Sequence, residues 1–504
     1  DNADQSIGLV SALLDSSAPG VWRSDLPSPG RQNGFLIPNP PPAITEVSHA
    51  PQSPHSWDTV TISARISDPD GVSTVRLWLQ GVLPGSYIRL TDSSYKTAWD
   101  AIPMQPAGGD VYTAQVPASY GRHRELVRYR IEALDGGGRG IVVPYADDPQ
   151  PNFAYFVYDG VPTWRGAIVA NSGGDLGRVR DYDFNQMRAL PAYHLLAQHQ
   201  DVVDSQFIPG TTYLEGYMGS DYPWLGTLVV NGVVYDHIRF RARGGEYRYS
   251  VGKNHWKFDF TRGHGFQAYD DYGRPYPAKW DKLNFSAVIQ HAQRHFRGEQ
   301  GLFESLGYRL FNLFGVPTSS TYFVQFRVID DWDQTTNNQY EGDFWGLYLA
   351  LENLDGKFLN ERGLPDGNLY DMSAWTGELD NLGDTGVTDK SDLNYFMSAY
   401  NAGWPDTQWW RNTFDLDGYY RFRSVLEAVH HYDVDQGKNY YYYLNPQTNK
   451  WRILPWDLDL TWSETMFGEG NEPFRDRVLT NPAFNLEYQN NLRELRDLLF
   501  NTEQ

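Results

Sequence analysis

One short segment near the C-terminus combines four aspartates and an asparagine on either side of an aromatic stretch. Asp433, Asp435 and Asn439 precede the run YYYYL, and Asp457 and Asp459 follow the run WRILPW. Carboxylate and amide oxygens are the ligands that Mg²⁺ and Mn²⁺ prefer. The set as a whole therefore predicts a divalent metal site. Each aspartate taken alone is more simply interpreted as a solvated residue at a loop end.

The two aromatic runs predict how these residues are positioned. YYYYL and WRILPW are separated by the turn sequence NPQTNK, a pattern typical of a β-hairpin. The residues that enter the first strand and leave the second lie at the same open end, so Asn439 and Asp457 should meet there. Alternation of side chains along a strand also directs Asp457 and Asp459 to one face, if the strand continues.

The order of these residues is that of a phosphoryl-transfer site. In protein kinases a catalytic aspartate and a downstream asparagine precede a hairpin, and a metal-binding aspartate follows it. Here Asp433 or Asp435 would be the first aspartate, Asn439 the asparagine and Asp457 the second aspartate. Such chemistry requires a metal ion, a lysine that holds the phosphates and a base near the acceptor hydroxyl.

Two amphipathic helices are expected to support this hairpin. The first spans 300–315 and ends at Gly315, with leucines at helical spacing at Leu302, Leu306, Leu310 and Leu313. The second spans 419–432, with apolar residues at helical spacing at Phe422, Val425, Leu426 and Val429. Both stripes are interpreted as core faces.

The length of 504 residues favours two or three domains. Residues 1–42 are rich in proline and glycine and are interpreted as an irregular linker, with a faint resemblance to the end of a lamin-tail-like domain. Residues 43–160 contain short alternating segments separated by turns, which predicts an all-β sandwich resembling immunoglobulin-like or fibronectin-like modules. Residues 161–504 have a mixed α and β character.

Composition excludes several function classes. A formal charge of −21 argues against a nucleic-acid partner, and no apolar run is long enough to predict a membrane span. The absence of cysteine excludes disulfides, thiol nucleophiles and cysteine-ligated zinc. The acidic surface, rich in Asn, Tyr and Gly, favours an extracellular or cell-surface location.

Two acidic loops have the composition of a structural Ca²⁺ site. They are DPDG at 68–71 and DNLGDTGVTDKSD at 380–392. A plain turn is the simpler interpretation of the first. The second misses the spacing of an EF-hand and is interpreted as a solvated loop that binds an ion opportunistically.

Several longer motifs together resemble a known family. They are RFRARGGEYRYSVGKNHWKFDF, GLYLALENLDGKFLNERGLPDGNLYDM and EAVHHYDVDQGKNYYYYLNPQTNKWRILPWDLDLTW, with a helix ending in LFGVPTSS. These motifs follow one another along the chain in the order that the family has, and over roughly 165–470 the chain resembles the CotH-type kinases, which are related to spore coat protein H. The resemblance implies an atypical protein-kinase-like α+β fold for 161–504, and transfer of phosphate from ATP to Ser or Thr of protein partners.

The resemblance also implies roles for individual residues. By its position in the WDxD motif Asp457 would bind the metal ion, assisted by Asp459 and Asn439. Asp433 or Asp435 would be the catalytic aspartate, and both remain candidates.

The remaining implied roles concern the nucleotide. Lys257 or Lys253 would hold the phosphates, and Glu352 would orient that lysine or line the nucleotide pocket. Without the resemblance, Lys257 is more simply interpreted as part of the exposed face of a strand.

A non-enzymatic interpretation stays open. A kinase-like domain can serve as a catalytically silent scaffold in a surface adhesion or structural protein, because a fold does not fix a function. Its partner would then be a surface or matrix protein instead of a protein substrate. The set of aspartates and Asn439 favours the enzyme, whereas the β-sandwich and the aromatic surface favour the scaffold.

Overall fold

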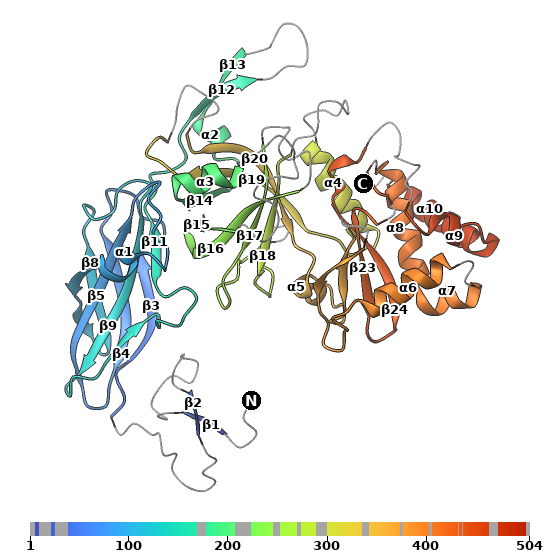
Figure 1. The fold of residues 1–504 in the computed structure, drawn as a ribbon. Helices are drawn as coiled ribbons and strands as arrows, with labels where there is room; N and C mark the ends of the chain where they lie inside the picture. The colour runs from blue at the N-terminus through green and yellow to red at the C-terminus, as the bar shows by residue number, and fades with distance from the viewer. Residues whose placement is uncertain are drawn as a thin grey trace.

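The computed structural model describes residues 6–9, 22–25, 39–168, 178–206, 223–244, 253–269, 274–288, 300–334, 342–372, 376–402, 406–431, 433–435, 437–462 and 472–499. Within them the chain is multi-domain and rich in strands. Figure 1 shows three bodies in a row: a two-sheet β unit, a barrel, and a unit of sheet and helices.

The N-terminal segment contains regular structure that the sequence did not predict. β1 (Ser6–Leu9) and β2 (Trp22–Asp25) pair as an antiparallel two-stranded sheet. The expectation of a wholly irregular linker over 1–42 is therefore wrong. Most of this segment, including the lamin-tail-like motif, lies outside the described residues.

The first body consists of two antiparallel sheets. One has the order β3-β4-β8-β7, from Ala43–Ala50, Val60–Ser67, Val111–Val116 and Gln105–Gly108. The other has the order β10-β9-β5-β6, from Gly140–Val143, Leu126–Asp135, Val72–Val82 and Asp100–Pro103, with β11 (Phe153–Phe156) also on β9 and α1 (Ser93–Thr97) beside it. Alternate residues of β4 and β9 point into a shared apolar core. The alternation of apolar and polar residues in the sequence therefore correctly predicted two packed sheets in this region. Membership of the immunoglobulin-like class stays a prediction.

The second body is a closed seven-stranded barrel. Its strands follow the order β14-β15-β16-β17-β18-β20-β19, from Ala192–Ala197, Trp224–Val230, Val233–Arg243, His255–Asp259, Lys282–Ser286, Phe344–Glu352 and Thr321–Ile329. The parallel pair β14–β19 closes a barrel that is otherwise antiparallel. Aromatic side chains such as Phe240, Trp256 and Phe326 fill its interior. β12 (Trp164–Ile168), β13 (Arg178–Tyr182), α2 (Phe184–Met187) and α3 (His199–Gln206) flank it.

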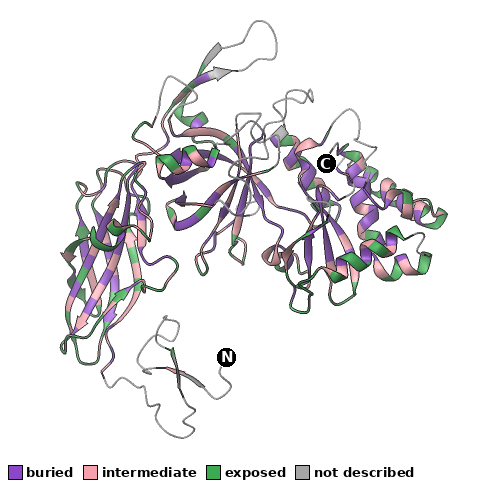
Figure 2. Cartoon of the chain, in the orientation of Figure 1, coloured by how far each residue is buried: buried purple, intermediate pink, exposed green. Residues whose placement is uncertain are grey.

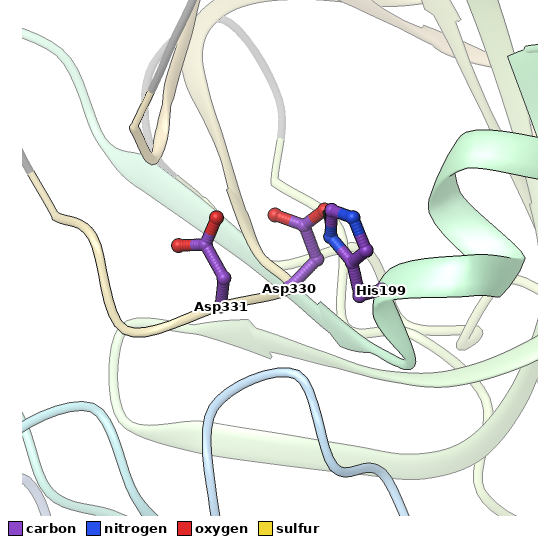
Figure 3. Close-up of side chains that lie close together, drawn as sticks. All are labelled: His199, Asp330 and Asp331. Atoms are coloured by element: carbon purple, nitrogen blue, oxygen red, sulfur yellow. Dashed lines mark hydrogen bonds and ion pairs between the residues drawn. The ribbon is translucent and has the colours of Figure 1, made fainter.

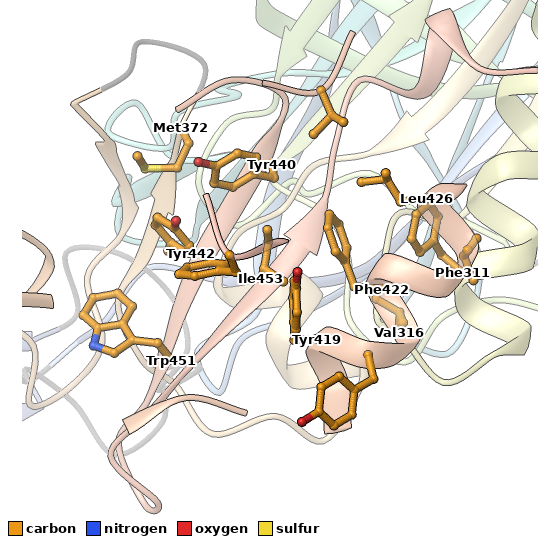
Figure 4. Packing of buried hydrophobic residues seen from close by; sticks show 14 of the residues in the cluster. Phe311, Val316, Met372, Tyr419, Phe422, Leu426, Tyr440, Tyr442, Trp451 and Ile453 are labelled. Carbon is orange, nitrogen blue, oxygen red and sulfur yellow. The ribbon is translucent and has the colours of Figure 1, made fainter. Parts of the chain in front are cut away.

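The third body packs helices on a four-stranded sheet. The sheet order is β22-β21-β23-β24, from Glu378–Asn381, Leu369–Asp371, Tyr440–Asn445 and Lys450–Pro455. The helices are α4 (Gln300–Leu313), α5 (Gly356–Glu361), α6 (Ser391–Asn401), α7 (Thr407–Thr413), α8 (Leu416–Ala428), α9 (Arg475–Val478), α10 (Pro482–Leu499) and the 3₁₀ turn η3 (Leu458–Leu460). Figure 4 shows α8 packed through Phe422 and Leu426 beside Tyr440, Tyr442 and Ile453 of the hairpin.

The two predicted helices differ in which face they bury. In α8 all four predicted apolar residues are buried, so that prediction is confirmed. In α4 the leucine stripe faces outward: Leu302 is 50% exposed and Leu313 is 57% exposed. The face that packs on the molecule instead carries Glu304, Tyr308 and Phe311. The prediction of a leucine core face was wrong because the helix has a second stripe of equal period.

The two β-rich bodies share a tight junction. Figure 2 shows buried residues continuing from the two-sheet unit to the facing wall of the barrel. Arg128 of β9 donates to Asp236 of β16 at 2.7 Å and 3.1 Å, and both side chains are fully buried. Among the helices that the structure describes, none has the length and apolar character needed to cross a bilayer.

Candidate functional site

The predicted hairpin is present and brings its flanking residues together. Tyr440 of β23 pairs with Pro455 of β24, so Asn439 and Asp457 lie at the open end of the pair. Both have left-handed backbones, with φ of 68° at Asn439 and 54° at Asp457. Such strained conformations in residues other than glycine persist where the surroundings enforce them, which is common at functional sites.

Asp433 is tied directly to this end of the hairpin. Its carboxylate accepts hydrogen bonds from Lys438 Nζ at 2.6 Å and from Asn439 Nδ2 at 3.0 Å. Asn439 Nδ2 also donates to the Asp433 carbonyl at 2.9 Å. These hydrogen bonds hold the segment around Asp433, which precedes the hairpin, against the first residue of the hairpin.

Three further carboxylates gather beside Asp433: Asp457, Asp459 and Glu304. Burial raises the pKa of Glu304 to about 7 and raises the pKa of Asp457 above its usual value. Burial and the neighbouring charges of Asp457, Glu304 and Asp433 raise the pKa of Asp459 far above the ordinary range. Its Oδ1 atom is buried and has no hydrogen-bond partner among the described residues. Like charges held together in this way are neutralised either by protons or by a bound cation.

Helix α4 supplies Glu304 because it packs closely on η3. At Gly307 the helix lies against Leu458, and a Cβ there would be in ordinary contact with Leu458 Cδ1 at 3.4 Å. The Trp462 indole N–H donates to the Phe303 carbonyl at 3.1 Å. Glu304 itself accepts from the Ser286 hydroxyl at 2.6 Å, which fixes the carboxylate between barrel and hairpin.

Two cations act on these carboxylates. The positive charge of Arg243, at the end of β16, partly offsets the rise in the pKa of Glu304, Asp457 and Asp459. The charge of Lys438 does the same for Asp457. The Arg243 guanidinium carbon lies 5.6 Å from the centre of the Trp456 indole ring. Its Nε is buried and unpartnered within the described part of the chain. The site is thus a cluster of carboxylates with two positively charged side chains, Arg243 and Lys438, beside it.

The residues predicted to handle the nucleotide lie elsewhere. Glu352 is buried and forms a two-pronged pair with Arg362, at 2.9 Å and 2.5 Å, instead of pairing with a lysine. Lys253 Nζ donates to the carbonyls of Ala287 and Leu347 and lies 4.2 Å from the centre of the Tyr348 ring. The expected lysine–Glu352 pair is therefore not formed.

Lys257 faces a different group of charges. It lies opposite Arg241 on the outer wall of the barrel, and burial together with Lys282 lowers its pKa. Asp380 and Asp259 are the carboxylates that oppose this shift. Asp380 accepts from the Tyr441 hydroxyl at 2.9 Å.

Asp435 is separated from the cluster by a tight turn. It forms an isolated bridge with Lys438, whose N–H donates to the Asp435 carbonyl at 3.1 Å. The geometry thus distinguishes two aspartates that the sequence left equivalent.

The two acidic loops proposed for Ca²⁺ use their carboxylates internally. Asp68 accepts from the backbone N–H of Asp70 at 2.8 Å, which is the geometry of a plain turn. Asp392 accepts from the Tyr370 hydroxyl at 2.6 Å and from the Asn368 amide. The Ca²⁺ assignment stays a prediction.

A second group of potential metal ligands lies just beyond the C-terminal ends of β14 and β19. Figure 3 shows His199, Asp330 and Asp331 side by side, with His199 Nδ1 3.0 Å from Asp330 Oδ2. A pocket of about 510 Å³, partly lined by His199 and Tyr87, adjoins it. His199 is exposed and its Asp330 contact is an ordinary surface pair, so this group is a weaker candidate than the carboxylate cluster.

Sequence reasoning missed Glu304 and Arg243. Glu304 is the one acidic residue within the helix at 300–313, and it lies on the stripe opposite the leucines. Arg243 stands in the motif RFRARGG, ahead of Lys253 and Lys257, to which the family resemblance assigns the phosphates. The sequence shows the positions of both residues, but it does not show that either lies near Asp457 in the fold.

Comparison with known proteins agrees with the motifs. Residues 240–504, more than half of the chain, match the family described as CotH kinase protein. Inner spore coat protein H of Bacillus subtilis (strain 168) is 23% identical over 238 residues, which cover 41% of this chain and 65% of that protein. The chain thus spans just under two-thirds of this curated relative.

Among solved structures, the cycloalternan-degrading enzyme from Trueperella pyogenes is 12% identical over 60% of this chain and 30% of its own. Its TM-score of 0.16 carries no argument about the fold. The family match covers every residue of the carboxylate cluster together with Arg243 and Lys438. This chain belongs to the CotH kinase protein family.

Proposed function

We propose that this protein transfers the terminal phosphoryl group of ATP to Ser or Thr hydroxyls of a partner protein, with Mg²⁺ or Mn²⁺. The observation that carries the proposal is the convergence of Asp433, Asn439, Asp457 and Asp459 at the open end of one hairpin. Family membership supports the same reaction class. The kinase-like nature of the fold is part of this proposal.

The chemistry of the residues present suits a divalent metal ion, which would draw their oxygens closer together than the metal-free geometry holds them. Asp457, Asp459 and Glu304 offer hard oxygen ligands. Asp459 Oδ1 is buried and accepts no hydrogen bond from the described residues, so it is available to a metal ion. Because Asn439 Nδ2 is used on Asp433, only the amide oxygen of Asn439 remains as a ligand. When bound, the metal ion would neutralise phosphate charge during transfer.

The protein's own groups would perform the rest. Asp433 would accept the proton of the acceptor hydroxyl and orient that oxygen, with Asn439 and Lys438 holding its carboxylate in place. Arg243 and Lys438 would attract the phosphate chain, in the role first assigned to Lys253 or Lys257. Lys257 remains a candidate contact for more distant parts of the nucleotide, because it lies on the same barrel wall as Arg243.

The setting of the reaction is inferred from the relative. The name of this relative places it in the inner spore coat. We infer by analogy that this chain acts at a surface or outside the cell, on a protein of that surface. The acidic composition accords with this location.

A labelled-ATP assay with Mg²⁺ or Mn²⁺ tests the proposal on four proteins: wild type, Asp457→Asn, Asp433→Asn and Asp435→Asn. Transfer to a generic protein acceptor and autophosphorylation are the readouts. Asp457→Asn should abolish transfer because it weakens metal binding. Asp433→Asn should lower the rate roughly 10²–10⁴-fold, the usual effect of losing a positioned base.

Asp435→Asn is the matched control and should retain activity within a fewfold of wild type. Equal losses at Asp433 and Asp435 would contradict the assignment of the base. A wild type that binds ATP and metal without any transfer would favour the scaffold alternative. Absence of nucleotide and metal binding would overturn the kinase proposal altogether.

A further inference from the structure

A second polar cluster lies between the barrel and the two-sheet unit. His194 of β14 and Arg327 of β19 are direct partners in the parallel pair that closes the barrel. Their neighbours Leu195 and Val328 point into the barrel core, so His194 and Arg327 point outward. That outer wall is covered by the two-sheet unit through Val82, Leu126 and Phe156, among other residues.

Arg327 is the central group of this cluster. Its side chain is 1% exposed, and its Nε donates to Gln325 Oε1 at 3.1 Å. Nη1 and Nη2 are both buried and have no hydrogen-bond partner in the described part of the chain. The guanidinium carbon lies 5.2 Å from the centre of the Phe344 ring. A buried guanidinium with four unused N–H donors is strongly unfavourable unless an acceptor meets it.

The nearby carboxylate does not meet this need. Asp343 forms its ion pair with Arg124, whose other donors reach the carbonyls of Trp332 at 2.7 Å and Asp331 at 2.9 Å. Asp343 Oδ2 is buried and has no hydrogen-bond partner among the described residues, and its charge also attracts Arg327 without a hydrogen bond. Two buried guanidinium groups, Arg124 and Arg327, therefore share the charge of one carboxylate. Arg124 Nε is a further buried donor that lacks a partner among the residues described.

His194 is the uncharged ring of this cluster. It is 6% exposed, its ring centre lies 4.5 Å from that of Tyr158, and its Nε2 is buried and unpartnered within the described ranges. Burial and the charge of Arg327 lower the pKa of His194 to about 3, so its ring is uncharged at neutral pH. The buried groups then comprise two arginines and one aspartate, an excess of one positive charge. Asp331, at the partly exposed edge, is screened by solvent.

We propose that this cluster binds one small monovalent anion, a halide such as chloride, between the barrel and the two-sheet unit. Arg327 Nη1 and Nη2 would be its main donors, with Arg124 Nε beside them. The single excess charge favours a monovalent ion, and close packing of the two bodies favours a small one. The bound anion would fasten one body to the other, independently of phosphoryl transfer.

Thermal unfolding of the full chain tests this site. Melting temperature is measured at constant ionic strength while gluconate is replaced by chloride or bromide. Wild type should show a saturable rise, on the order of a few degrees, because a ligand that binds only the folded state stabilises it. Arg327→Met should abolish the dependence on halide. Arg65→Met removes an exposed arginine of the same two-sheet unit and should leave the dependence unchanged.

A crystal grown with bromide supplies a second measurement that needs no variant. An anomalous peak within hydrogen-bond distance of Arg327 Nη1 or Nη2 is expected. A water molecule there with no anomalous signal would overturn the proposal. An equal halide response in wild type and Arg327→Met, or none in wild type, would overturn it as well.

Discussion

At the scale of single residues, the carboxylate cluster is a site of stored unfavourable energy. Asp457, Asp459 and Glu304 share a buried volume in which their charges repel one another. Arg243 and Lys438 offset part of that repulsion. A protein selected for stability alone would replace such carboxylates with neutral groups, so their presence indicates a ligand of opposite charge.

Replacing Glu304 separates stability from metal binding. Glu304→Gln keeps the side-chain shape and removes one buried charge. Since the pKa of Glu304 is raised to about 7, the metal-free variant at pH 8 should be more stable than wild type by up to about 3 kcal/mol. The stabilisation conferred by Mg²⁺ or Mn²⁺ should fall at the same time. Calorimetry with and without metal measures both effects.

The control for this experiment is Asp435→Asn, which removes an acidic charge outside the cluster. It should leave the metal-induced shift intact. If Glu304→Gln lowers metal-free stability and leaves the metal effect unchanged, Glu304 serves only as the acceptor for Ser286.

At the scale of elements, the hairpin and α4 build the site from two directions. The hairpin places Asn439 and Asp457 through strand register, which is local in sequence. Helix α4 places Glu304 by packing Gly307 against Leu458, a contact between distant parts of the chain. The orientation of α4 about its own axis therefore decides whether Glu304 or the leucines face the site.

The orientation of α4 can be tested by stability. Phe311 is fully buried, and Phe311→Ala should cost about 3–5 kcal/mol of unfolding free energy. Leu302→Ala removes a half-exposed side chain from the same helix and should change it by roughly 0.5 kcal/mol or less. Urea denaturation of both variants provides the comparison. The reverse ranking would restore the leucine face as the core face.

At the scale of the whole molecule, the two-sheet unit and the barrel behave as one joined body. Asp236 is fully buried in the junction and accepts hydrogen bonds from Arg128, Thr227 at 2.6 Å and Asn152 at 2.9 Å. Beside it, His237 contacts the Tyr87 hydroxyl at 3.1 Å and the Asn152 amide at 2.8 Å. These bonds require the ring in its present buried position.

The junction should weaken in acid because of His237. Burial lowers the pKa of His237 to about 4, against an ordinary value of 6.5, although Asp236 opposes the shift and Arg128 and Arg130 add to it. The unfolded chain therefore binds the proton more tightly, and stability is lost as pH falls from 6.5 towards 4. The loss should approach about 3 kcal/mol. Melting temperature measured from pH 7.5 to pH 4 reports it.

His237→Asn isolates this contribution, since asparagine tolerates the left-handed backbone at this position. The variant should be less stable than wild type at pH 7.5 and should lose less stability on acidification. Parallel curves for the two proteins would assign the acid sensitivity to other groups.

The sequence by itself determined the features that depend on near neighbours in the chain. Alternation and turn residues predicted the β23–β24 hairpin, and hairpin geometry then brought Asn439 to Asp457. Apolar spacing identified α8 and its buried face. Period-two patterning predicted two packed sheets after residue 43. Each of these follows from local stereochemistry that holds whatever the rest of the fold does.

Only the tertiary structure decided which distant groups complete the site. The helix at 300–313 has two stripes of the same period, and packing on η3 selected the one that carries Glu304. Barrel closure placed Arg243 near Asp457. Lys253 instead donates to backbone carbonyls, and Glu352 pairs with Arg362. Asp433 and Asp435 were separated in the same way, by a turn that ties Asp433 to Asn439. Contacts between distant segments depend on how whole elements pack, and periodicity along the chain carries no information about that.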